Sequence, residues 1–453
     1  MSLSKRAEKS LDTDPAFMAI YKALGNKYDA HTNATGTVIL GVAENSLMAP
    51  ELSQFFTQNF SITPYQLTYG DGYSGSIPLR NALAKHLNET LHPTPELTVT
   101  PDHVVVTAGV TAMLDMLAWA LTEPGEGILI GRPLYSGFLP DVVMRSEAVP
   151  VLVELEEEGI DFFGAEAVRR HETAIREAEG RGVKVRALIL CNPHNPLGKC
   201  YPPEILELYL KLCTRHNIHL ISDELYALSS YRTPNNTSSP AFTSLLSLPS
   251  TPALIDPNNL HILYGMSKDF GSNGLRLGCL ITRHQDLKSS LLGVGRFPWA
   301  SSASDVLWTK FLLDEEFKAR YFATNSQRIA ESYMFLREWL QERRIPFVEG
   351  TTHGFFMWVD MRELLGDQGR EGERRLMEKL LEVGVWIASG ESFGSSVPGW
   401  FRITFTVERE VLVEGLRRLG RVVDEVRREG LVRGEGVKGV EEVEAEGKER
   451  LAN

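Results

Sequence analysis

Short apolar runs alternate with helical stretches along the middle of this 453-residue chain, and this alternation limits the folds open to it. Several of the runs are apolar at every position, which is typical of strands covered on both faces. Stretches with helical spacing, such as 111–121 and 203–216, separate them. The pattern predicts an α/β fold with a mostly parallel central sheet that binds ligands at the carboxyl ends of its strands. The strand-like runs are 103–109, 127–133, 149–155, 187–193, 218–224, 260–266 and 277–282.

The character of the sequence changes after about residue 305. Amphipathic helical patterns over 306–343 lead into strand-like runs at 355–361, 384–389 and 401–407, which indicate a smaller α+β unit. Residues 428–453 are charged and poor in large apolar side chains, and we expect them to be disordered. We therefore predict an N-terminal arm (1–35), a large domain (61–304), a small domain (36–60 with 305–427) and a tail (428–453).

Composition excludes several classes of protein. The net charge of -12 argues against a nucleic-acid partner, because phosphate backbones are bound by basic surfaces. No apolar run is long enough to span a bilayer, and the N-terminus has no hydrophobic signal core, so we expect a cytoplasmic protein without membrane contact. The four cysteines lack the spacing of metal ligands; we expect buried, reduced thiols and no metal site.

Two short motifs match known patterns without their context. GDGYSG at 70–75 fits the G-x-G-x-x-G of dinucleotide-binding turns, but no buried strand precedes it, and a loop is expected. GESFG at 390–394 fits the G-x-S-x-G of a nucleophile elbow, but Pro398 and Gly399 prevent the helix that must follow. We reject both motifs as functional sites.

A lysine and an arginine flank a glycine-rich loop in YGMSKDFGSNGLRLG (264–278). An apolar run ends just before Ser267 and Lys268, glycines follow at 271 and 274, and Arg276 comes eight residues after the lysine. Taken alone, Lys268 is best interpreted as a solvated residue at the end of a strand. Other stretches change that interpretation.

Two of these stretches follow predicted strands and can hold a ligand. Gly109 ends one strand, and Val110 and Thr111 begin a helix whose free N–H groups and hydroxyl suit an anion. Two Asn-Pro pairs after the run 187–193 hold the amide of Asn195 in a rigid turn. The alternatives are an ordinary capped helix and a purely structural turn.

Two further stretches carry charge within apolar sequence. Asp223 ends a strand, with Tyr226 three residues later, and a buried carboxylate is costly unless it meets a cation. Arg402 interrupts an apolar strand, and its planar fork suits a carboxylate. The alternatives are that Asp223 caps the next helix and that Arg402 forms an internal salt bridge. Together the stretches supply a phosphate cradle, a pyridinium partner, a phenolic-oxygen partner, a Schiff-base lysine and a carboxylate receptor, which pyridoxal phosphate (PLP) requires.

On these motifs the chain resembles the fold-type-I PLP enzymes of the class I/II aminotransferase group, over about residues 36–425. Within that group it is most similar to 1-aminocyclopropane-1-carboxylate (ACC) synthase. The resemblance implies the PLP-dependent transferase fold, with a seven-stranded sheet, PLP as cofactor, an amino-acid substrate and a homodimer with shared active sites. The motifs that carry it are GVAENSL (41–47), TAGVTA (107–112), NPHNPLG (192–198), SDELYA (222–227), SKDFGSNGLRLG (267–278) and PGWFRITF (398–405).

The resemblance also implies a role for each matching residue. Lys268 would form the internal aldimine and then transfer protons, and Asp223 would pair with the pyridine nitrogen. Asn195 and Tyr226 would donate to the phenolic oxygen. Tyr135 would stack on the ring; the alternative is that it is a tyrosine of the apolar core. The phosphate would be held by the N–H of Val110 and by Thr111, Ser267 and Arg276, while Arg402 would clamp the substrate carboxylate.

Some positions depart from the family pattern. Tyr69 would reach the phosphate of a neighbouring subunit, but YGDGYSG is one residue longer than the usual spacing, so Tyr73 competes for this role. Gly265 stands where the family commonly has a hydroxyl residue. The loop reads FGSNGLR where ACC synthases more often read LGLPGFR. These departures bear on reaction specificity more than on phosphate binding.

Glu44 bears most directly on the reaction. The matching acidic residue of ACC synthase lies beside the substrate side chain and suits a sulfonium or amino group; the alternative is an N-cap of a short helix. We therefore expect a reaction through an external aldimine and a quinonoid that ends in ACC-synthase-like C–S cleavage or α,γ-elimination, on a sulfur-bearing amino acid or S-adenosylmethionine. Transfer of the amino group to a 2-oxo acid by an aminotransferase is the alternative.

Overall fold

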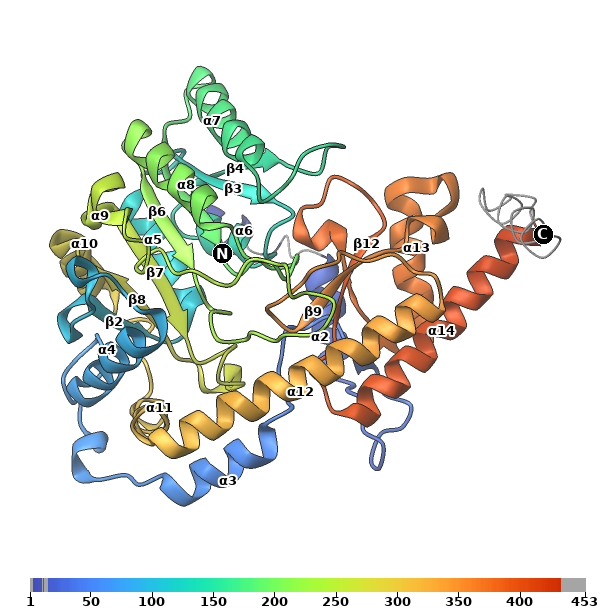
Figure 1. The fold of residues 1–453 in the computed structure, drawn as a ribbon, viewed down its shortest axis with the longest axis horizontal. Helices are drawn as coiled ribbons and strands as arrows, with labels where there is room; N and C mark the ends of the chain where they lie inside the picture. Colours follow the sequence, from blue (N-terminus) through green and yellow to red (C-terminus); the bar gives the residue numbers. More distant parts are fainter. Residues whose placement is uncertain (1–2, 10, 12–14, 433–453) are drawn as a thin grey trace.

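The computed structural model describes residues 3–9, 11 and 15–432. Its centre is a seven-stranded sheet in the order β2-β8-β7-β6-β5-β3-β4 (Figure 1). Neighbouring strands pair in parallel except β8, which is antiparallel to both β2 and β7. The predicted strands and their mostly parallel arrangement are confirmed. Their bounds are β2 (Val104–Thr107), β3 (Gly127–Arg132), β4 (Val149–Glu154), β5 (Val185–Cys191), β6 (His219–Asp223), β7 (Leu260–Gly265) and β8 (Gly278–Thr282).

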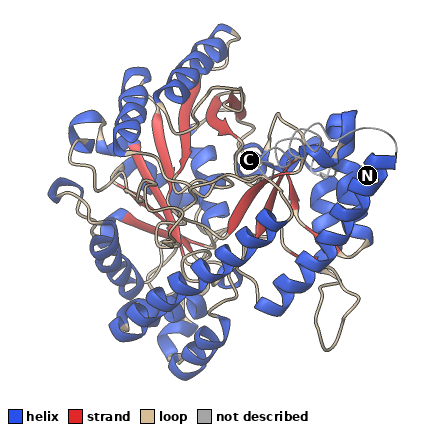
Figure 2. Ribbon diagram, turned by 45° about the vertical axis from the view of Figure 1, so that its right-hand side comes forward, coloured by secondary structure: helices blue, strands red, loops and turns tan. Residues whose placement is uncertain are grey.

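Helices cover both faces of this sheet (Figure 2). Successive residues of a strand point to opposite faces, so Leu188 and Leu190 of β5 join one apolar cluster and Ile189 joins the other. The first cluster includes α4 (Ile77–Leu91), α7 (Ala165–Gly180) and α8 (Pro203–His216). The second includes α5 (Val110–Leu121), α6 (Phe138–Val143) and α10 (Gln285–Val294). Burial on both faces explains why the strands are apolar at nearly every position.

A smaller antiparallel sheet in the order β11-β12-β9 lies beside the large one, with α13 (Gly369–Glu382) and α14 (Arg409–Val432) next to it (Figure 1). Its strands are β9 (Phe356–Asp360), β11 (Ala388–Ser389) and β12 (Trp400–Thr404). The run 384–389 is not one strand, because β10 (Val385–Trp386) pairs instead with β1 (Val38–Ile39). The division into a large and a small domain at the predicted boundaries stays a prediction.

Helix α12 (Glu315–Glu342) runs from the side of the large sheet to the small one (Figure 1). The helical pattern over 306–343 is divided into α11 (Ser302–Leu313) and α12 by Asp314, whose side chain caps α12 by accepting the N–H of Phe317 at 2.9 Å. Helix α3 (Ala49–Asn59) packs against α11. The remaining helices are α1 (Lys5–Lys9), α2 (Pro15–Leu24), α9 (Thr251–Leu254), and the single-turn helices η1 (Pro64–Leu67), η2 (Pro95–Leu97), η3 (Pro101–His103), η4 (Pro257–Asn259), η5 (Asn273–Leu275), η6 (Arg362–Leu364), η7 (Gly366–Gln368) and η8 (Gly390–Phe393).

Several smaller expectations can be compared with the structure. The expected disorder is wrong for residues 428–432, which continue α14, and residues 433–453 lie outside the described residues. The stretch 70–75 is a loop, and 390–394 forms the short η8 with no α-helix after it, so both rejected motifs lack their required context. All four cysteines are buried and free, as predicted. Across the described ranges, no helix combines the length and apolarity needed to cross a bilayer.

Candidate active site

The predicted site residues gather at one edge of the large sheet. Strands β2, β3, β5, β6 and β7 run parallel, so the segments that follow them emerge at the same edge. Strand β8 runs the other way and begins at this edge, where Gly278 pairs with Gly265 of β7. Lys268 and Arg276 therefore lie on the loop that joins two antiparallel neighbours, and this explains how the chain returns the arginine to the region of the lysine.

Lys268 is held inside the site and is not a solvated strand end. Its Nζ donates to the backbone oxygen of Ala43 at 2.7 Å. Burial lowers the pKa of Lys268 to about 8, and the positive charge of Arg402 adds to this effect. The carboxylates of Glu44 and Asp223 act in the opposite direction. A lysine with such a pKa is neutral far more often near neutral pH than a solvated lysine.

Asp223 is a buried carboxylate at the end of β6. One of its oxygens accepts the backbone N–H of Leu225 at 3.2 Å, and no α-helix begins there for it to cap. Burial raises the pKa of Asp223 to about 6, while the Leu225 N–H and the charge of Lys268 offset part of this rise. Among the side chains that the structure describes, no Lys, Arg or His lies within ion-pair distance of its carboxylate.

Arg402 is a buried cation without an anionic partner in the described part of the chain. Its guanidinium donates to Oδ1 of Asn195 at 2.8 Å and to the backbone oxygen of Gly41 at 2.5 Å. The group lies between the rings of Phe356 and Phe393, at 4.8 and 4.7 Å from their centroids. Burial lowers the pKa of Arg402 to about 10. The alternative of an internal salt bridge is wrong, because both hydrogen bonds go to neutral oxygens.

Two tyrosines complete this part of the site. Tyr226 packs edge-on against Phe355 and Phe356, and its buried hydroxyl has no hydrogen-bond partner within the described residues. Burial raises the pKa of Tyr226 well above its usual value. Burial likewise raises the pKa of Tyr135 to about 12, with further contributions from the charges of Asp141, Arg402, Asp223 and Arg276. The stacking of Tyr135 on a cofactor ring stays a prediction, with a core tyrosine as the alternative.

The anion cradle is built where α5 begins. Gly109, with φ of 96°, precedes α5, and no side chain of the described chain caps its free N–H groups. A Cβ atom on Gly109 would lie 2.4 Å from a terminal nitrogen of Arg276, so the guanidinium sits directly against the helix start. Val110 and Thr111 open the helix, and buried Ser267 precedes the lysine.

The departure at Gly265 has a steric reason. A Cβ atom at this position would lie 3.0 Å from the backbone oxygen of Leu277 and 3.1 Å from Cα of Gly278. Leu277 directly precedes β8 and Gly278 is its first residue, and Gly278 is packed against the start of α5. A residue with a side chain at this position would therefore require a shift of a few tenths of an ångström at the start of β8.

Glu44 lies in the site and does not cap a helix. Helix α3 begins only at Ala49, and its N-cap is Met48. One oxygen of Glu44 accepts the side-chain amide of Asn273 at 2.8 Å, and the other lies 3.9 Å from Nζ of Lys27. Because Glu44 follows Ala43, which bonds to Lys268, its carboxylate acts on the pKa of that lysine. The N-cap alternative is therefore wrong.

For Tyr69 and Tyr73, the described part of the chain shows ring contacts with Trp299 and no hydrogen bond to the other predicted site residues. Both contact Trp299: Tyr69 stacks on it at 5.3 Å between ring centroids, and Tyr73 meets it edge-on at 4.8 Å. The ring of Tyr69 is 83% exposed, whereas Tyr73 is 36% exposed. The structure of a single chain therefore places both candidates on a surface, and the choice between them stays open.

Asp141 is a site residue that we did not predict from the sequence. It lies on α6 and is partly buried, and Oδ2 of its carboxylate is a buried atom without a hydrogen-bond partner among the residues described. Burial raises the pKa of Asp141 to about 7, with contributions from Asp115 and Asp223, and the Thr111 hydroxyl offsets part of this rise. The signal was an aspartate inside the apolar stretch FLPDVV, where a buried charge needs a reason.

The residues present fit PLP. Buried polar groups normally have partners, and those without one point to a ligand or ordered water. Among the described residues of the site, the hydroxyl of Tyr226 and Nε of Arg402 have no hydrogen-bond partner, the carboxylate of Asp223 has no cation in ion-pair distance, and the N–H groups at the start of α5 have no side-chain cap. In PLP, the phenolic oxygen would accept from Tyr226, the pyridinium nitrogen would pair with Asp223, and the phosphate would accept from the helix N–H groups. The α-carboxylate of the amino-acid substrate would pair with Arg402.

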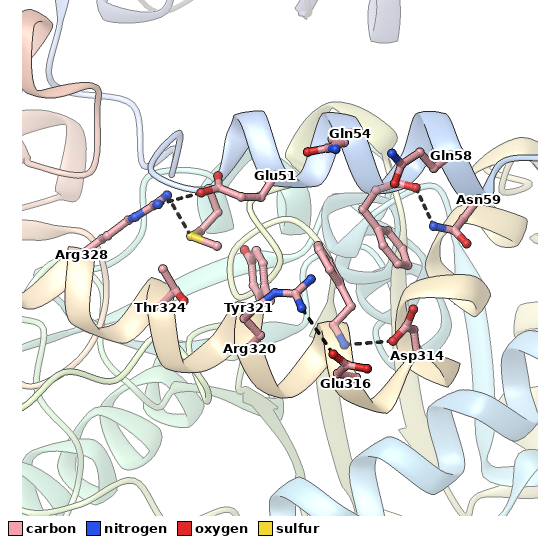
Figure 3. Close-up of a pocket in the computed structure, with 13 residues that line it drawn as sticks. Glu51, Gln54, Gln58, Asn59, Asp314, Glu316, Arg320, Tyr321, Thr324 and Arg328 are labelled. Carbon is pink, nitrogen blue, oxygen red and sulfur yellow. Dashed lines mark hydrogen bonds and ion pairs between the residues drawn. The ribbon is translucent and has the colours of Figure 1, made fainter.

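A separate cavity of about 500 Å³ lies between α3 and the first half of α12 (Figure 3). Its charged side chains mostly pair with one another: Arg328 binds Glu51 at 2.6 Å, and Arg320 lies 3.8 Å from Glu316. No predicted site residue lines it. Tyr321 connects its wall to the backbone of Asp269, next to the site lysine.

Comparison with known proteins agrees with this geometry. The family model described as aminotransferase class I and II matches residues 64–419. The chain is 34% identical over 394 residues to "Probable aminotransferase gliI" of Aspergillus fumigatus, covering 84% of this chain and 88% of the relative. It is also 34% identical over 405 residues to human "1-aminocyclopropane-1-carboxylate synthase-like protein 1", covering 88% and 78%.

Solved structures share the fold at lower identity. A Thermus thermophilus aspartate aminotransferase mutant complexed with tryptophan superposes with a TM-score of 0.72 at 22% identity, covering 93% of this chain and 100% of the other. The aromatic aminotransferase of Pyrococcus horikoshii gives 0.70 at 20% identity, covering 90% and 99%. This chain belongs to the class I and II aminotransferase family of PLP-dependent enzymes.

Proposed function

We propose that this PLP enzyme is a C–S lyase of the ACC-synthase-like kind, acting on a sulfur-bearing amino acid or on S-adenosylmethionine. The observation that carries the proposal is the position of Glu44: it directly follows Ala43, whose backbone oxygen binds Lys268, and its carboxylate acts on the pKa of that lysine. A carboxylate at this place attracts a cationic or hydrogen-bond-donating side chain and repels a second carboxylate. The site therefore disfavours amino acids whose side chain ends in a carboxylate without a cationic group beside it.

When bound, PLP supplies an electron-withdrawing ring that stabilises negative charge at the substrate Cα. We assign Asp223 to the pyridine nitrogen, because its buried carboxylate gains a cation there. We assign the unpaired hydroxyl of Tyr226 and the amide nitrogen of Asn195 to the phenolic oxygen; Oδ1 of Asn195 already binds Arg402, which leaves its NH₂ to donate. Tyr135 would cover one face of the ring.

The phosphate would lie between the start of α5 and the loop before β8. The N–H of Val110 and the hydroxyl of Thr111 would donate from the helix, where the dipole also favours an anion. Arg276, against Gly109, would supply the positive charge, and Ser267 a further hydroxyl. Lys268 is the amine that would hold the cofactor covalently.

In the reaction the side chains of this chain orient the substrate and move a proton. Arg402 would take the α-carboxylate through its fork, because its charge has no anionic partner in the described structure. Nζ of Lys268 would remove the Cα proton, and its pKa of about 8 keeps a useful fraction neutral. From an S-substituted cysteine the C–S bond then breaks, sulfur leaves as a thiol, and one water molecule is consumed to give pyruvate and ammonia. From S-adenosylmethionine a thioether leaves, ACC forms and one proton is released.

Transamination is the second candidate, and the names of the relatives favour it. Several curated relatives, including those of Aspergillus fumigatus and Aspergillus oryzae, are named as probable aminotransferases. The same lysine would then return the proton to the cofactor carbon, and no C–S bond would break. Both reactions use the same first proton transfer, so the geometry of Lys268 alone does not separate them.

We also propose that the enzyme is a homodimer with shared active sites. Exposed aromatic and aliphatic side chains gather around the loop that carries Tyr69, and apolar surface of this kind marks a contact with another protein. Tyr69 is the better candidate to reach the phosphate of the partner, because its ring is far more exposed than that of Tyr73. A cytoplasmic location stays a prediction.

The test is to incubate the holoenzyme with amino-acid and sulfonium substrates in the absence of a 2-oxo acid. Repeated release of thiol, thioether or ACC supports the lyase, whereas one equivalent of the pyridoxamine form per active site supports the aminotransferase. Lys268→Ala should abolish both outcomes and the bound chromophore. Lys310→Ala, an exposed lysine on α11, is the matched control and should keep full activity.

A further inference from the structure

We propose that Lys27, Glu44 and Asn273 form a site for the far end of the substrate, and that this end carries both an ammonium and a carboxylate group. The inference rests on the proposed C–S lyase function, because it specifies which sulfur compounds the enzyme takes. In this assignment the far end lies beyond the sulfur, at the opposite end of the substrate from the α-carboxylate that Arg402 would hold.

The three side chains place one negative charge, one positive charge and an amide together. Nδ2 of Asn273 donates to one oxygen of Glu44 at 2.8 Å, and Nζ of Lys27 lies 3.9 Å from the other oxygen. The side chains of Lys27 and Glu44 are 59% and 37% exposed. They are thus open to a ligand, unlike the buried groups of the cofactor site.

The backbone on either side of this pair is held in place. The hydroxyl of Thr406 donates to the backbone oxygen of Glu44 at 2.6 Å. The side-chain amide of Asn33 donates to the backbone oxygen of Lys27 at 2.9 Å. The segment that carries Lys27 is anchored to α14 by buried Arg418, which donates to the backbone oxygens of Ala34 and Gly36. Lys27 is therefore presented to Glu44 by a fixed loop.

Asn273 connects this site to the phosphate side of the active site. Its backbone oxygen accepts a hydrogen bond from Arg276 at 2.9 Å, while its side chain reaches Glu44. It belongs to the loop FGSNGLR, one of the places where the chain departs from the ACC-synthase pattern. The departure supplies a hydrogen-bond donor that orients the Glu44 carboxylate.

The charges of the site select among substrate ends. An end with only a cation must displace Lys27 from Glu44, and an end with only an anion meets the Glu44 carboxylate. A neutral end removes water from the charges of Lys27 and Glu44 and offers no hydrogen bond in its place, which is unfavourable. An end with both groups pairs its ammonium with Glu44 and its carboxylate with Lys27, so that each charge keeps a partner. Thioethers that join two amino acids have such ends.

The experiment compares matched S-substituted cysteines that differ only in the far end. L-cystathionine carries both charges, S-(3-aminopropyl)-L-cysteine only the cation, S-(3-carboxypropyl)-L-cysteine only the anion, and S-propyl-L-cysteine neither. Dissociation constants come from stopped-flow absorbance of the holoenzyme cofactor before turnover. We expect L-cystathionine to bind about tenfold more tightly than each of the other three, which corresponds to one additional charge pair.

Variants then test each residue. Lys27→Ala should weaken L-cystathionine and the carboxypropyl compound about tenfold and strengthen the aminopropyl compound, which no longer has to displace Lys27 from Glu44. Glu44→Gln should weaken L-cystathionine and the aminopropyl compound. Lys27→Glu should make the aminopropyl compound the preferred one. Lys22→Ala, an exposed lysine on the same N-terminal segment, is the control and should change none of the four.

Equal binding of the four compounds, or an equal effect of Lys27→Ala on all four, would overturn the inference. Its failure is distinct from failure of the proposed function. If the enzyme releases no thiol but forms a 2-oxo acid, the lyase is wrong, and the order of dissociation constants still decides whether Lys27 and Glu44 recognise a doubly charged end. If thiol is released at equal affinity from all four, the lyase stands and the inference fails.

Discussion

Replacing Asp223 with asparagine should make the protein without cofactor more stable at neutral pH. The carboxylate of Asp223 is buried, and within the described chain its only hydrogen bond is from the N–H of Leu225. Asparagine keeps a side-chain oxygen for that hydrogen bond and carries no charge. The substitution therefore removes a buried charge and leaves its hydrogen bond in place.

The size and pH dependence of the effect follow from the pKa. Burial raises the pKa of Asp223 from 3.8 to about 6, so the folded protein holds its proton more tightly than the unfolded chain. The wild type thus loses stability as pH rises from 3.8 through 6, and the loss is complete above pH 6. Because one pKa unit corresponds to about 1.4 kcal/mol, Asp223→Asn should be more stable by about 3 kcal/mol near pH 7.5 and by about 1 kcal/mol near pH 4.5.

Urea unfolding of the cofactor-free proteins at both pH values measures the difference directly. The other titrating groups are common to both proteins, so the change in the difference with pH isolates Asp223. Asp256→Asn is the matched control. The carboxylate of Asp256 accepts a hydrogen bond from the backbone N–H of Asn258, two residues later, as that of Asp223 does from Leu225, but Asp256 is exposed. A difference that stays constant between the two pH values would refute the reasoning. With PLP bound the order should reverse, because the pyridine nitrogen loses its anionic partner.

Three further predictions follow from the same site. Arg402→Lys should lower kcat/KM for an amino-acid substrate about 10- to 100-fold, because lysine lacks the two-pronged guanidinium. It should leave the affinity for the matching amine, which has no carboxylate, unchanged. Equal losses for both compounds would contradict the assignment. Gly109→Ala should raise the PLP dissociation constant at least about tenfold in absorbance titrations, because its Cβ displaces Arg276 and a φ of 96° disfavours alanine; unchanged affinity would remove Arg276 from the cradle. Tyr226→Phe should stabilise the cofactor-free protein by about 1 kcal/mol in urea unfolding, since it removes an unpaired buried hydroxyl, yet weaken PLP binding; destabilisation would mean that the hydroxyl has a partner in the protein itself.

Much of the site could be predicted because parallel strands impose a simple rule. Residues just beyond the carboxyl ends of neighbouring strands meet at one edge, so Asn195, Asp223 and Lys268 could be brought together from the strand pattern alone. Arg276 follows from the same rule once β8 is antiparallel to β7, because a connection between antiparallel neighbours returns to the edge that it left. The specific roles came from the family resemblance.

Other parts of the site depend on contacts between distant segments. Lys27 and Asn273 lie 246 positions apart in the sequence, and both approach Glu44 only because the N-terminal segment is anchored to α14. Asp141 belongs to a short helix, and its apolar neighbours in the sequence do not indicate that Asp115 and Asp223 act on its carboxyl group. The run 384–389 was expected to be one strand, and its division between two sheets depends on the partners β1 and β12.

By itself the sequence determined the α/β class, the seven strands of the large sheet and the residues that follow each of them, because periodicity and apolar runs are local properties of the chain. The tertiary structure alone decided which charges are left without partners. Burial and distance depend on every element that packs around a group. Only the folded structure shows that, among the residues it describes, Arg402 has no anionic partner and Asp223 no cationic one, and that Lys27 lies beside Glu44.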